Sequence, residues 1–442
     1  MKKFLLVGLL MLALVFLPAL AACSSSTSTT ASAIAPVTTS ASAASTASTA
    51  QPAASTTSEA AVSTTAAKTL KIGVIGWFGT SKHLDSIHGI EVLAGMDNQN
   101  GGWDIGGEKY KIELCIYDSN NSQTSEVAAV NKMIFQDKVS YIMGQGVYGA
   151  AWLPITEENK VIAMSPTHNY FVALDPKFNY SFEPTCVNGT SSTMIGWICT
   201  RHPELAKTIV VAFPDNQMGH MIAGDVQAGW KAFNATINCI YYPTDTQDLS
   251  SLGTKVATTN PSVFEAVGGG NSDLLAIKAA YQAGYRGQMF ASTINPATVM
   301  AQTVPEEALN GMICGAYPTE FEPALTQKAI DFKAGWIAKY GKWEDPDIAI
   351  TSSYDCLKTA IQKTGSLDTT VLAAAIGNGL QFETAVGTIQ MVSRPDFGNS
   401  RTVDSLAISY VKKMNGTQPE LLDTVNLEDG LKYWELSFPA KQ

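Results

Sequence analysis

Apolar residues in the region 68–442 form two kinds of pattern, short continuous runs and segments in which they recur every three or four positions. The runs predict buried strands, and the recurring positions predict helices. The predicted strands are, in chain order, 70–75, 111–117, 139–143, 161–164, 208–213, 236–241, 263–267 and 288–291. The clearest predicted helices carry Ile87, Ile90, Leu93 and Ala94; Val127, Val130 and Ile134; and Ile222, Val226, Trp230 and Phe233. This alternation is typical of an α/β protein whose parallel sheets are covered by helices on both faces.

The length of this region predicts more than one hydrophobic core. Residues 68–442 number 375, and single cores stop growing at roughly 250 to 300 residues. The break in the pattern between 164 and 208 separates two strand series. We therefore expect two doubly wound parallel-sheet lobes.

The N-terminus has the pattern of an export signal. Lys2 and Lys3 precede an apolar stretch from Phe4 to Leu17, and small residues lead to Cys23. The sequence LAAC at 20–23 resembles the lipobox of bacterial lipoproteins, in which the Cys sulfur takes the lipid. We expect 1–22 to be the lipoprotein signal peptide and Cys23 to be lipidated; the alternative is an ordinary signal that ends near a Cys.

The next segment, 23–67, is almost entirely Ser, Thr and Ala after Cys23. Glu59 is its only charged residue. Such a composition buries too little apolar surface to offset the entropy of ordering the chain, so the segment is predicted to be a disordered linker on the lipid anchor.

Composition and charge exclude several classes of function. Removing Lys2 and Lys3 with the signal leaves 27 basic and 39 acidic residues, a net charge of −12. An acidic chain repels phosphate backbones, so we expect no nucleic-acid partner. No run after the signal approaches the roughly 20 apolar residues that cross a bilayer, so membrane contact is expected only through the N-terminal lipid.

Several ordered segments resemble the extracytoplasmic solute-binding lipoproteins of ABC importers, of the branched-chain amino-acid (Leu/Ile/Val-binding) type. The segments are KIGVI at 71–75, NGGWDIGG at 100–107, KIELCIYD at 111–118, DKVSYIMG at 137–144, VIAMSP at 161–166, AGY at 283–285 and SYD at 353–355. Each is weak alone, but their order and spacing are specific over nearly all of 70–395.

This resemblance implies the type I periplasmic-binding-protein fold, in which two α/β lobes are joined by a hinge of three crossovers and hold a ligand between them. Lobe one would comprise 68–185 plus 315–390, and lobe two 186–314 plus 391–442. Ligands of open α/β sheets lie beyond the carboxyl ends of strands, which independently favours a cleft at this place.

The candidate ligand-binding residues lie in loops that follow predicted strands. They are Trp77, Phe78, Gln145, Gly146, Tyr148, Ser165, His168, Asn169, Met218, Asn271, Thr293 and Ile294. Trp77 and Phe78 could equally cover the top of the core. The loop at 144–149 matches GxGxxG, but it is not in the first βαβ unit and no acidic residue follows at the ribose-binding distance, so a dinucleotide site is rejected.

The resemblance also implies where the ligand's charged groups would bind. Relatives that bind α-amino acids place a Ser where Tyr148 stands, a Tyr where Met218 stands, and an acid where Ile294 stands. An ammonium group buried without an anion is unfavourable. We therefore expect an apolar or aromatic molecule or a neutral amide; the alternative is that another acid, such as Asp215, restores the pairing.

The sequence offers no catalytic or metal motif. The five His residues form no metal-ligand spacing, and neither HExxH nor GxSxG occurs, so no enzyme activity, metal or cofactor is expected. Six Cys remain beside Cys23: Cys115, Cys186, Cys199, Cys239, Cys314 and Cys356. They permit 15 pairings, of which the sequence selects none. At most one or two bridges are expected, with Cys186 and Cys199 closest in sequence.

These observations predict the substrate-binding component of an ABC importer. It would be a monomer attached to the cell membrane outside the cytoplasm. There it would capture a small organic solute (an amino acid, an amide or an aromatic compound) and deliver it to membrane permease subunits. Two alternatives remain, a sensory receptor of the same fold and an exported enzyme.

Overall fold

The computed structural model describes residues 68–439 except 80, 145, 147, 166–169, 244–245, 247 and 269. These residues belong to one compact unit, Thr64–Gln442. The predicted signal peptide, Cys23 and the predicted linker lie outside the described residues.

The first lobe is built on a six-stranded sheet of order β2-β3-β1-β4-β5-β6. Its strands are β1 (Lys68–Gly76), β2 (Trp103–Ile105), β3 (Glu108–Asp118), β4 (Tyr141–Gly144), β5 (Ile162–Met164) and β6 (Ser181–Phe182). All neighbours pair in parallel except β2 with β3. Alternate side chains of β1 enter different cores, with Val74 in one and Ile75 in the other.

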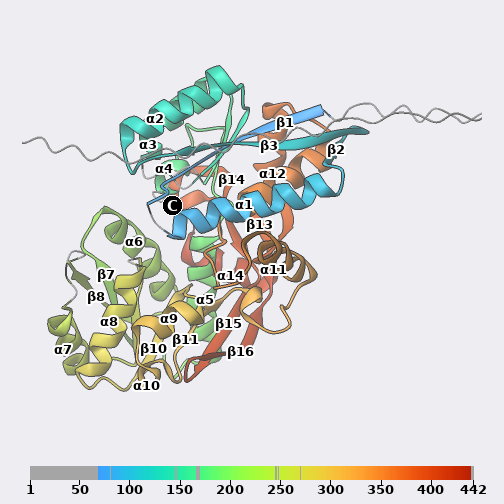
Figure 1. Ribbon diagram of the computed structural model, residues 1–442. Coiled ribbons are helices and arrows are strands. Elements are labelled where there is room, and N and C mark those ends of the chain that lie inside the picture. Colours follow the sequence, from blue (N-terminus) through green and yellow to red (C-terminus); the bar gives the residue numbers. More distant parts are fainter. Residues whose placement is uncertain are drawn as a thin grey trace, which may run out of the picture. The chain divides into compact units, whose positions relative to one another are not determined.

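Helices cover both faces of this sheet (Figure 1). One core contains residues of α1 (Ser81–Gln99), α11 (Gln327–Tyr340), α12 (Thr351–Thr364) and α13 (Thr369–Ile376). The opposite core contains residues of α2 (Gln123–Lys132), η1 (Met133–Asp137) and α3 (Gly149–Glu158). The short α4 (Tyr170–Ala173) follows β5.

The second lobe contains a seven-stranded sheet of order β16-β15-β11-β10-β9-β7-β8. Its strands are β7 (Thr208–Pro214), β8 (Thr236–Tyr242), β9 (Val263–Ala266), β10 (Gln288–Ile294), β11 (Ile313–Ala316), β15 (Ser409–Asn415) and β16 (Gln418–Val425). The first five are parallel, and β15 and β16 add an antiparallel edge.

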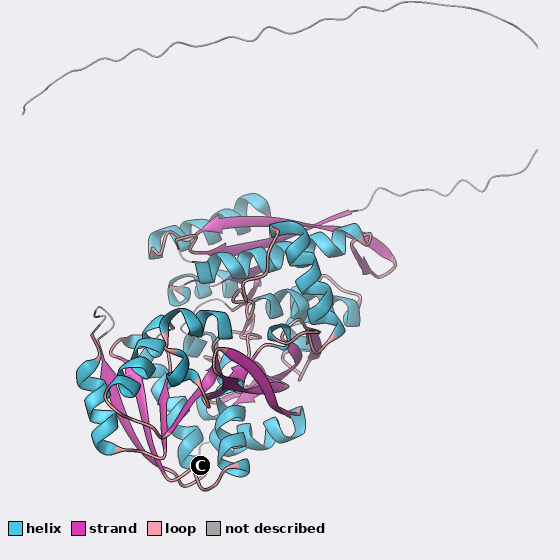
Figure 2. Cartoon of the chain, turned by 60° about the horizontal axis from the view of Figure 1, so that its bottom comes forward, coloured by secondary structure: helices cyan, strands magenta, loops and turns pink. Residues whose placement is uncertain are grey.

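Helices also lie on both sides of the second sheet, as Figure 2 shows. One core includes residues of α7 (Ser250–Thr259), α8 (Asn271–Gln282), α9 (Ala297–Thr303) and α10 (Glu306–Leu309). The other includes residues of α5 (Val187–Arg201) and α6 (Gln217–Ala232). The last helix, α14 (Leu427–Ser437), contacts α5 and α6.

Three crossovers join the lobes. The chain passes from β6 to α5, from β11 through η2 (Pro318–Glu320) to α11, and from β14 to β15. Before the third crossover, β12 (Gln381–Thr384), β13 (Gly387–Arg394) with η3 (Pro395–Phe397), and β14 (Asn399–Ala407) form a small antiparallel sheet. The predicted fold class is thus confirmed, and each of the eight predicted strands overlaps a strand of the structure. The residue ranges assigned to the lobes from the sequence stay a prediction.

No disulfide forms among the described cysteines, which is within the expected upper limit of one or two bridges. All six cysteines in the described part of the chain are free thiols. Cys186 precedes α5 and Cys199 lies near its end, so about 13 helical residues separate them by roughly 20 Å, far beyond the roughly 7 Å limit between bridged Cα atoms.

Candidate functional site

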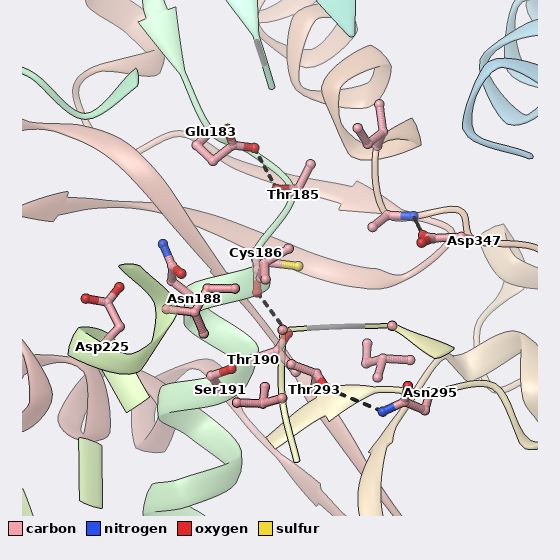
Figure 3. Close-up of a pocket in the computed structure, with 18 of the residues that line it drawn as sticks. Glu183, Thr185, Cys186, Asn188, Thr190, Ser191, Asp225, Thr293, Asn295 and Asp347 are labelled. Atoms are coloured by element: carbon pink, nitrogen blue, oxygen red, sulfur yellow. Dashed lines mark hydrogen bonds between the residues drawn. The ribbon is translucent and has the colours of Figure 1, made fainter. Parts of the chain in front are cut away.

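A cavity of about 190 Å³ lies where the crossovers meet loops of both lobes. Its wall is formed by the segment after β6, the first turns of α5, α6 and α8, the end of β10, and residues around 347–350. Figure 3 shows these segments converging on one space. Parallel strands and helix N-termini meet here, as expected for a ligand site in an open α/β fold.

Carboxylates are prominent in the wall. Glu183, Asp225, Asp273 and Asp347 line the cavity, and none of the described lining residues is Lys, Arg or His. No acid stands at the cleft positions predicted from the sequence, for which Asp215 was the possible substitute. In the structure Asp215 is exposed, 2.8 Å from Nε2 of His220, and it is not among the lining residues.

Glu183 lies in the first crossover and is 3% exposed. The Thr185 hydroxyl donates to its Oε1 at 2.6 Å, whereas its Oε2 is buried with no hydrogen-bond partner among the described groups. Burial, with a smaller contribution from the nearby carboxylate of Asp404, raises the pKa of Glu183 to about 8, although the hydroxyls of Thr185 and Ser165 oppose the rise.

The backbone of Glu183 is held by β14. Its N–H donates to the carbonyl of Val403 at 2.7 Å, and the hydroxyl of Ser405 donates to its carbonyl at 2.8 Å. The same hydroxyl accepts from the N–H of Cys186 at 2.8 Å. The first crossover is therefore fixed to the strand that leads into the third crossover.

The start of α5 follows directly. Cys186 has φ +53°, in the left-handed region, which lets the chain turn sharply from the crossover into the helix at Val187. The Thr190 hydroxyl donates to the Cys186 carbonyl at 2.9 Å. This turn brings Cys186, Asn188 and Ser191 into the cavity wall.

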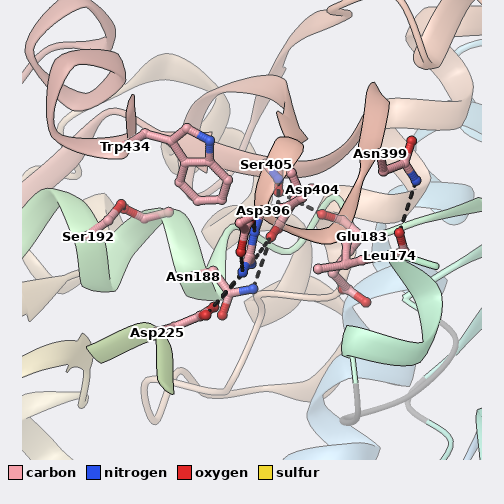
Figure 4. Close-up of polar contacts among 12 residues, drawn as sticks. Leu174, Glu183, Asn188, Ser192, Asp225, Asp396, Asn399, Asp404, Ser405 and Trp434 are labelled. Carbon is pink, nitrogen blue, oxygen red and sulfur yellow. Dashed lines mark hydrogen bonds and ion pairs between the residues drawn. The ribbon is translucent and has the colours of Figure 1, made fainter. Parts of the chain in front are cut away.

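A buried guanidinium pairs with an acidic residue of the cavity wall. Arg394 of β13 is fully buried and pairs with Asp225 at 3.0 Å, Asp396 at 2.8 Å and Asp404 at 3.1 Å. Asn188 donates to Asp404 at 3.0 Å. Figure 4 shows Asn188, Asp225, Asp396 and Asp404 converging. Burial raises the pKa of Asp225 to about 6 although Arg394 opposes this.

The first turn of α6 is set by a cap and a close approach. The side chain of Asn216 accepts from the N–H of Gly219 at 2.8 Å, which satisfies one free helix donor. A Cβ at Gly219 would lie 2.0 Å from the carbonyl oxygen of Pro214, so only glycine fits there. The helix places Met218, Ile222 and Asp225 in the wall.

The end of β10 supplies another part of the cavity wall. Thr293, Ile294 and Asn295 line the cavity. The buried Lys412 of β15 pairs with Glu320 and donates to the carbonyl of Asn295 at 2.6 Å. This ion pair joins β15 to the second crossover just behind the wall.

The residues proposed from the sequence divide into three groups. Ser165, Met218, Thr293 and Ile294 line the cavity. The structure places Trp77, Phe78, Gly146, Tyr148 and Asn271 outside the lining set. Gln145, His168 and Asn169 lie outside the described residues.

Three of the predicted residues that do not line the cavity form hydrogen bonds elsewhere. The N–H of Tyr148 donates to the buried Glu126 at 3.0 Å, and the N–H of Phe78 donates to Asp118 at 3.2 Å. The side chain of Asn271 accepts from Thr303 at 3.1 Å. All three are thus engaged within their own lobe.

The acidic residues of the wall were missed by the sequence analysis. Asp273 had a signal, because it stands at the start of a helix just after the glycines at 268–270. Glu183 had none, because it follows β6 (Ser181–Phe182), a two-residue strand that was not predicted. Asp225 falls one residue before the apolar Val226, in the middle of a predicted helix, where its contact with Arg394 has no sequence signature.

Comparisons with known proteins agree with this geometry. The family model described as periplasmic binding protein matches residues 69–414. A search of curated proteins finds no match. In the described residues, no helix is both long and apolar enough to cross a membrane.

Solved structures share the fold at low identity. Leucine binding protein LivK from Thermotoga maritima is 20% identical, with a TM-score of 0.62 over 81% of this chain and 99% of that one. A Rhodopseudomonas palustris ABC-transporter solute binding protein in complex with 3,4-dihydroxy benzoic acid is 17% identical, with a TM-score of 0.62 over 81% and 97%. LivJ from Streptococcus pneumoniae in complex with isoleucine is 16% identical, with a TM-score of 0.64 over 81% and 99%. The family match over most of the chain, together with two lobes joined by three crossovers, establishes that this chain belongs to the periplasmic binding protein family.

Proposed function

We propose that this protein is the substrate-binding component of an ABC importer. It captures a small organic solute in the cavity at the crossovers and delivers it to membrane permease subunits without catalysing a reaction. The observation that carries this proposal is the cavity itself, whose wall combines residues from both lobes with residues of the crossovers. A ligand that contacts all of them stabilises one arrangement of the lobes, which a permease can recognise.

The proposed place of action is the outer face of the cell membrane. Cys23 carries the lipid, the segment 24–67 acts as a tether, and the body works as a monomer. The related structures are a leucine binding protein and complexes with isoleucine and with 3,4-dihydroxy benzoic acid, so the solute of this chain is expected to be of similar size.

Ligand binding is tested by thermal shift on the full chain with amino acids, amides, amines and aromatic acids. A ligand at 100 times its Kd raises the unfolding free energy by about 2.7 kcal/mol. If no small solute of any class shifts the melting temperature, the proposal fails.

Transport is tested by uptake of the identified solute in cells that lack the gene. The intact chain should restore uptake. The Cys23→Ala variant should bind the solute equally well but be released from the membrane and restore less uptake. Binding without any contribution to uptake would contradict the importer role and favour a sensory receptor.

A further inference from the structure

Acidic residues surround the cavity as well as line it. Asp396 and Asp404 lie behind the wall and share one cation, Arg394, with Asp225. The other buried cation nearby, Lys412, is already paired with Glu320. Among the described residues, carboxylates therefore outnumber cations around the cavity, which disfavours an anionic ligand.

One of these acids, Glu183, has an oxygen that can still accept a hydrogen bond. Glu183 is buried, and its Oε2 accepts no hydrogen bond from the described residues although its Oε1 accepts one from Thr185. Buried polar atoms in folded proteins are normally paired. A ligand N–H group in this part of the cavity would supply the partner that Oε2 needs.

The rest of the wall is largely apolar. Its aliphatic side chains include Ile222, Val226, Val267, Ile294, Ile350 and Val386. The volume of about 190 Å³ exceeds the roughly 150 Å³ of an engineered cavity that holds benzene. The space thus suits an apolar body about the size of one ring with a polar group attached.

We infer that the ligand is an organic ammonium ion, a protonated amine on a small apolar body, whose N–H groups donate to Glu183. This inference rests on the proposed solute-binding function and names its substrate class. An aromatic acid would bring its carboxylate close to those of Asp225, Asp273 and Asp347, beside the protonated Glu183. The ammonium group of a zwitterionic amino acid would be stabilised by Glu183. Its carboxylate would find no Lys, Arg or His side chain among the described lining residues.

The inference implies proton release on binding. The charged and titratable groups near Glu183 are Asp404 of β14, which raises its pKa, and the Cys186 thiol at the start of α5. Because the pKa of Glu183 is about 8 in the free protein, the group is mostly protonated at pH 7. An ammonium ion stabilises the anion, so binding expels the proton and should tighten about tenfold per pH unit from pH 6 to 7, then level off above pH 8.

The test is isothermal titration calorimetry of the full chain with four probes: benzylamine, benzyl alcohol, benzoate and leucine. Benzylamine should bind at least tenfold more tightly than benzyl alcohol, and benzoate should bind more weakly than either. Titrations at pH 7 in two buffers of different ionisation enthalpy should report release of about one proton with benzylamine.

The Glu183→Gln variant separates charge from shape. It should weaken benzylamine binding by tenfold or more, abolish its pH dependence, and leave benzyl alcohol binding within about twofold. Retained benzyl alcohol binding shows that the variant is folded. The matched control Asp215→Asn removes an exposed carboxylate outside the wall and should change neither affinity by more than about twofold.

If the variant fails to fold, the wild-type probe series and its proton release still decide the question. Tighter binding of benzoate or leucine than of benzylamine would overturn the ammonium assignment while supporting solute binding. Equal benzylamine binding by Glu183→Gln would overturn the role of Glu183. Absence of binding by every solute class would instead overturn the proposed function.

Discussion

Glu183 contributes differently to the folded state at acid and at alkaline pH. Its pKa rises from the ordinary 4.5 to about 8 because the side chain is buried. The folded chain keeps the proton over this range while the unfolded chain releases it, so the stability that Glu183 provides is complete below about pH 4.5 and is lost as pH rises through 8.

Glu183→Gln removes this titration, because the amide is neutral at every pH. Relative to wild type, the variant should gain up to about 4 kcal/mol in unfolding free energy between pH 5 and 8, at about 1.4 kcal/mol per unit of pKa shift. Urea denaturation at pH 5, 6, 7 and 8 measures the difference. A constant difference across this series would contradict the raised pKa, and Asp215→Asn should stay within about 0.5 kcal/mol of wild type.

Arg394 is the second residue whose charge decides stability. Its guanidinium neutralises part of the charge of Asp225, Asp396 and Asp404 and lies 4.2 Å from the ring centre of Phe438. Arg394→Met preserves apolar packing but leaves buried carboxylates without their cation, so unfolding free energy should fall by about 3–5 kcal/mol.

Guanidinium denaturation at pH 7 tests this, with Arg201→Met as the matched control. Arg201 is exposed and 3.8 Å from Asp423, and exposed pairs contribute about 1 kcal/mol or less. Equal losses in the two variants would show that the buried cluster adds nothing beyond a surface pair.

At the scale of elements, the cap of α6 connects stability to the cavity. Asn216→Ala removes the acceptor for the Gly219 N–H and should lower unfolding free energy by about 1 kcal/mol. Because α6 places Met218 and Asp225 in the wall, loosening its first turn should also weaken ligand binding.

Thr326→Ala is the matched control for this cap. Its hydroxyl accepts from the Ala329 N–H at 3.1 Å at the start of α11, which does not line the cavity. It should show a similar loss of stability with unchanged affinity for the ligand found by thermal shift. If both variants bind equally well, the first turn of α6 does not position the site.

The predictability of the elements from the sequence depended on how they bury apolar residues. Strands such as β7 and β9, buried on both faces, produce continuous apolar runs and were predicted within a few residues. The small sheet was not predicted, because β13 and β14 bury Arg394, Asp404 and Ser405. A buried ion cluster breaks the apolar pattern that sequence reasoning follows.

The site was predicted less completely for a related reason. Ser165 and Met218 follow strands of the parallel sheets, and Thr293 and Ile294 are the last residues of β10, so their place at the carboxyl ends of the strands follows from topology alone. Glu183 belongs to a crossover, and its position depends on pairing with β14, more than 200 residues later in the chain. No local pattern in one sequence reports such a contact.

At the scale of the whole molecule, the three crossovers determine how the lobes can move. The first is fixed to β14 through Glu183, Cys186 and Ser405, and the second is joined to β15 by the pair of Glu320 with Lys412. Motion must therefore bend these linked segments together, which favours a hinge with few preferred positions over free rotation.

A saturating ligand should accordingly shift the population toward a closed form and lower the radius of gyration measured by small-angle X-ray scattering. The ligand is the one found by calorimetry. The control is the Glu183→Gln variant with the same solute, at a concentration below the Kd of that variant. The control should leave the scattering curve unchanged. A ligand can shift the equilibrium between the open and closed forms only if its affinity for them differs. A scattering curve that stays unchanged at proven saturation would therefore mean that both forms bind the solute equally well. The lobes would then act as a rigid receptor, and recognition of a closed form by a permease would lose its physical basis.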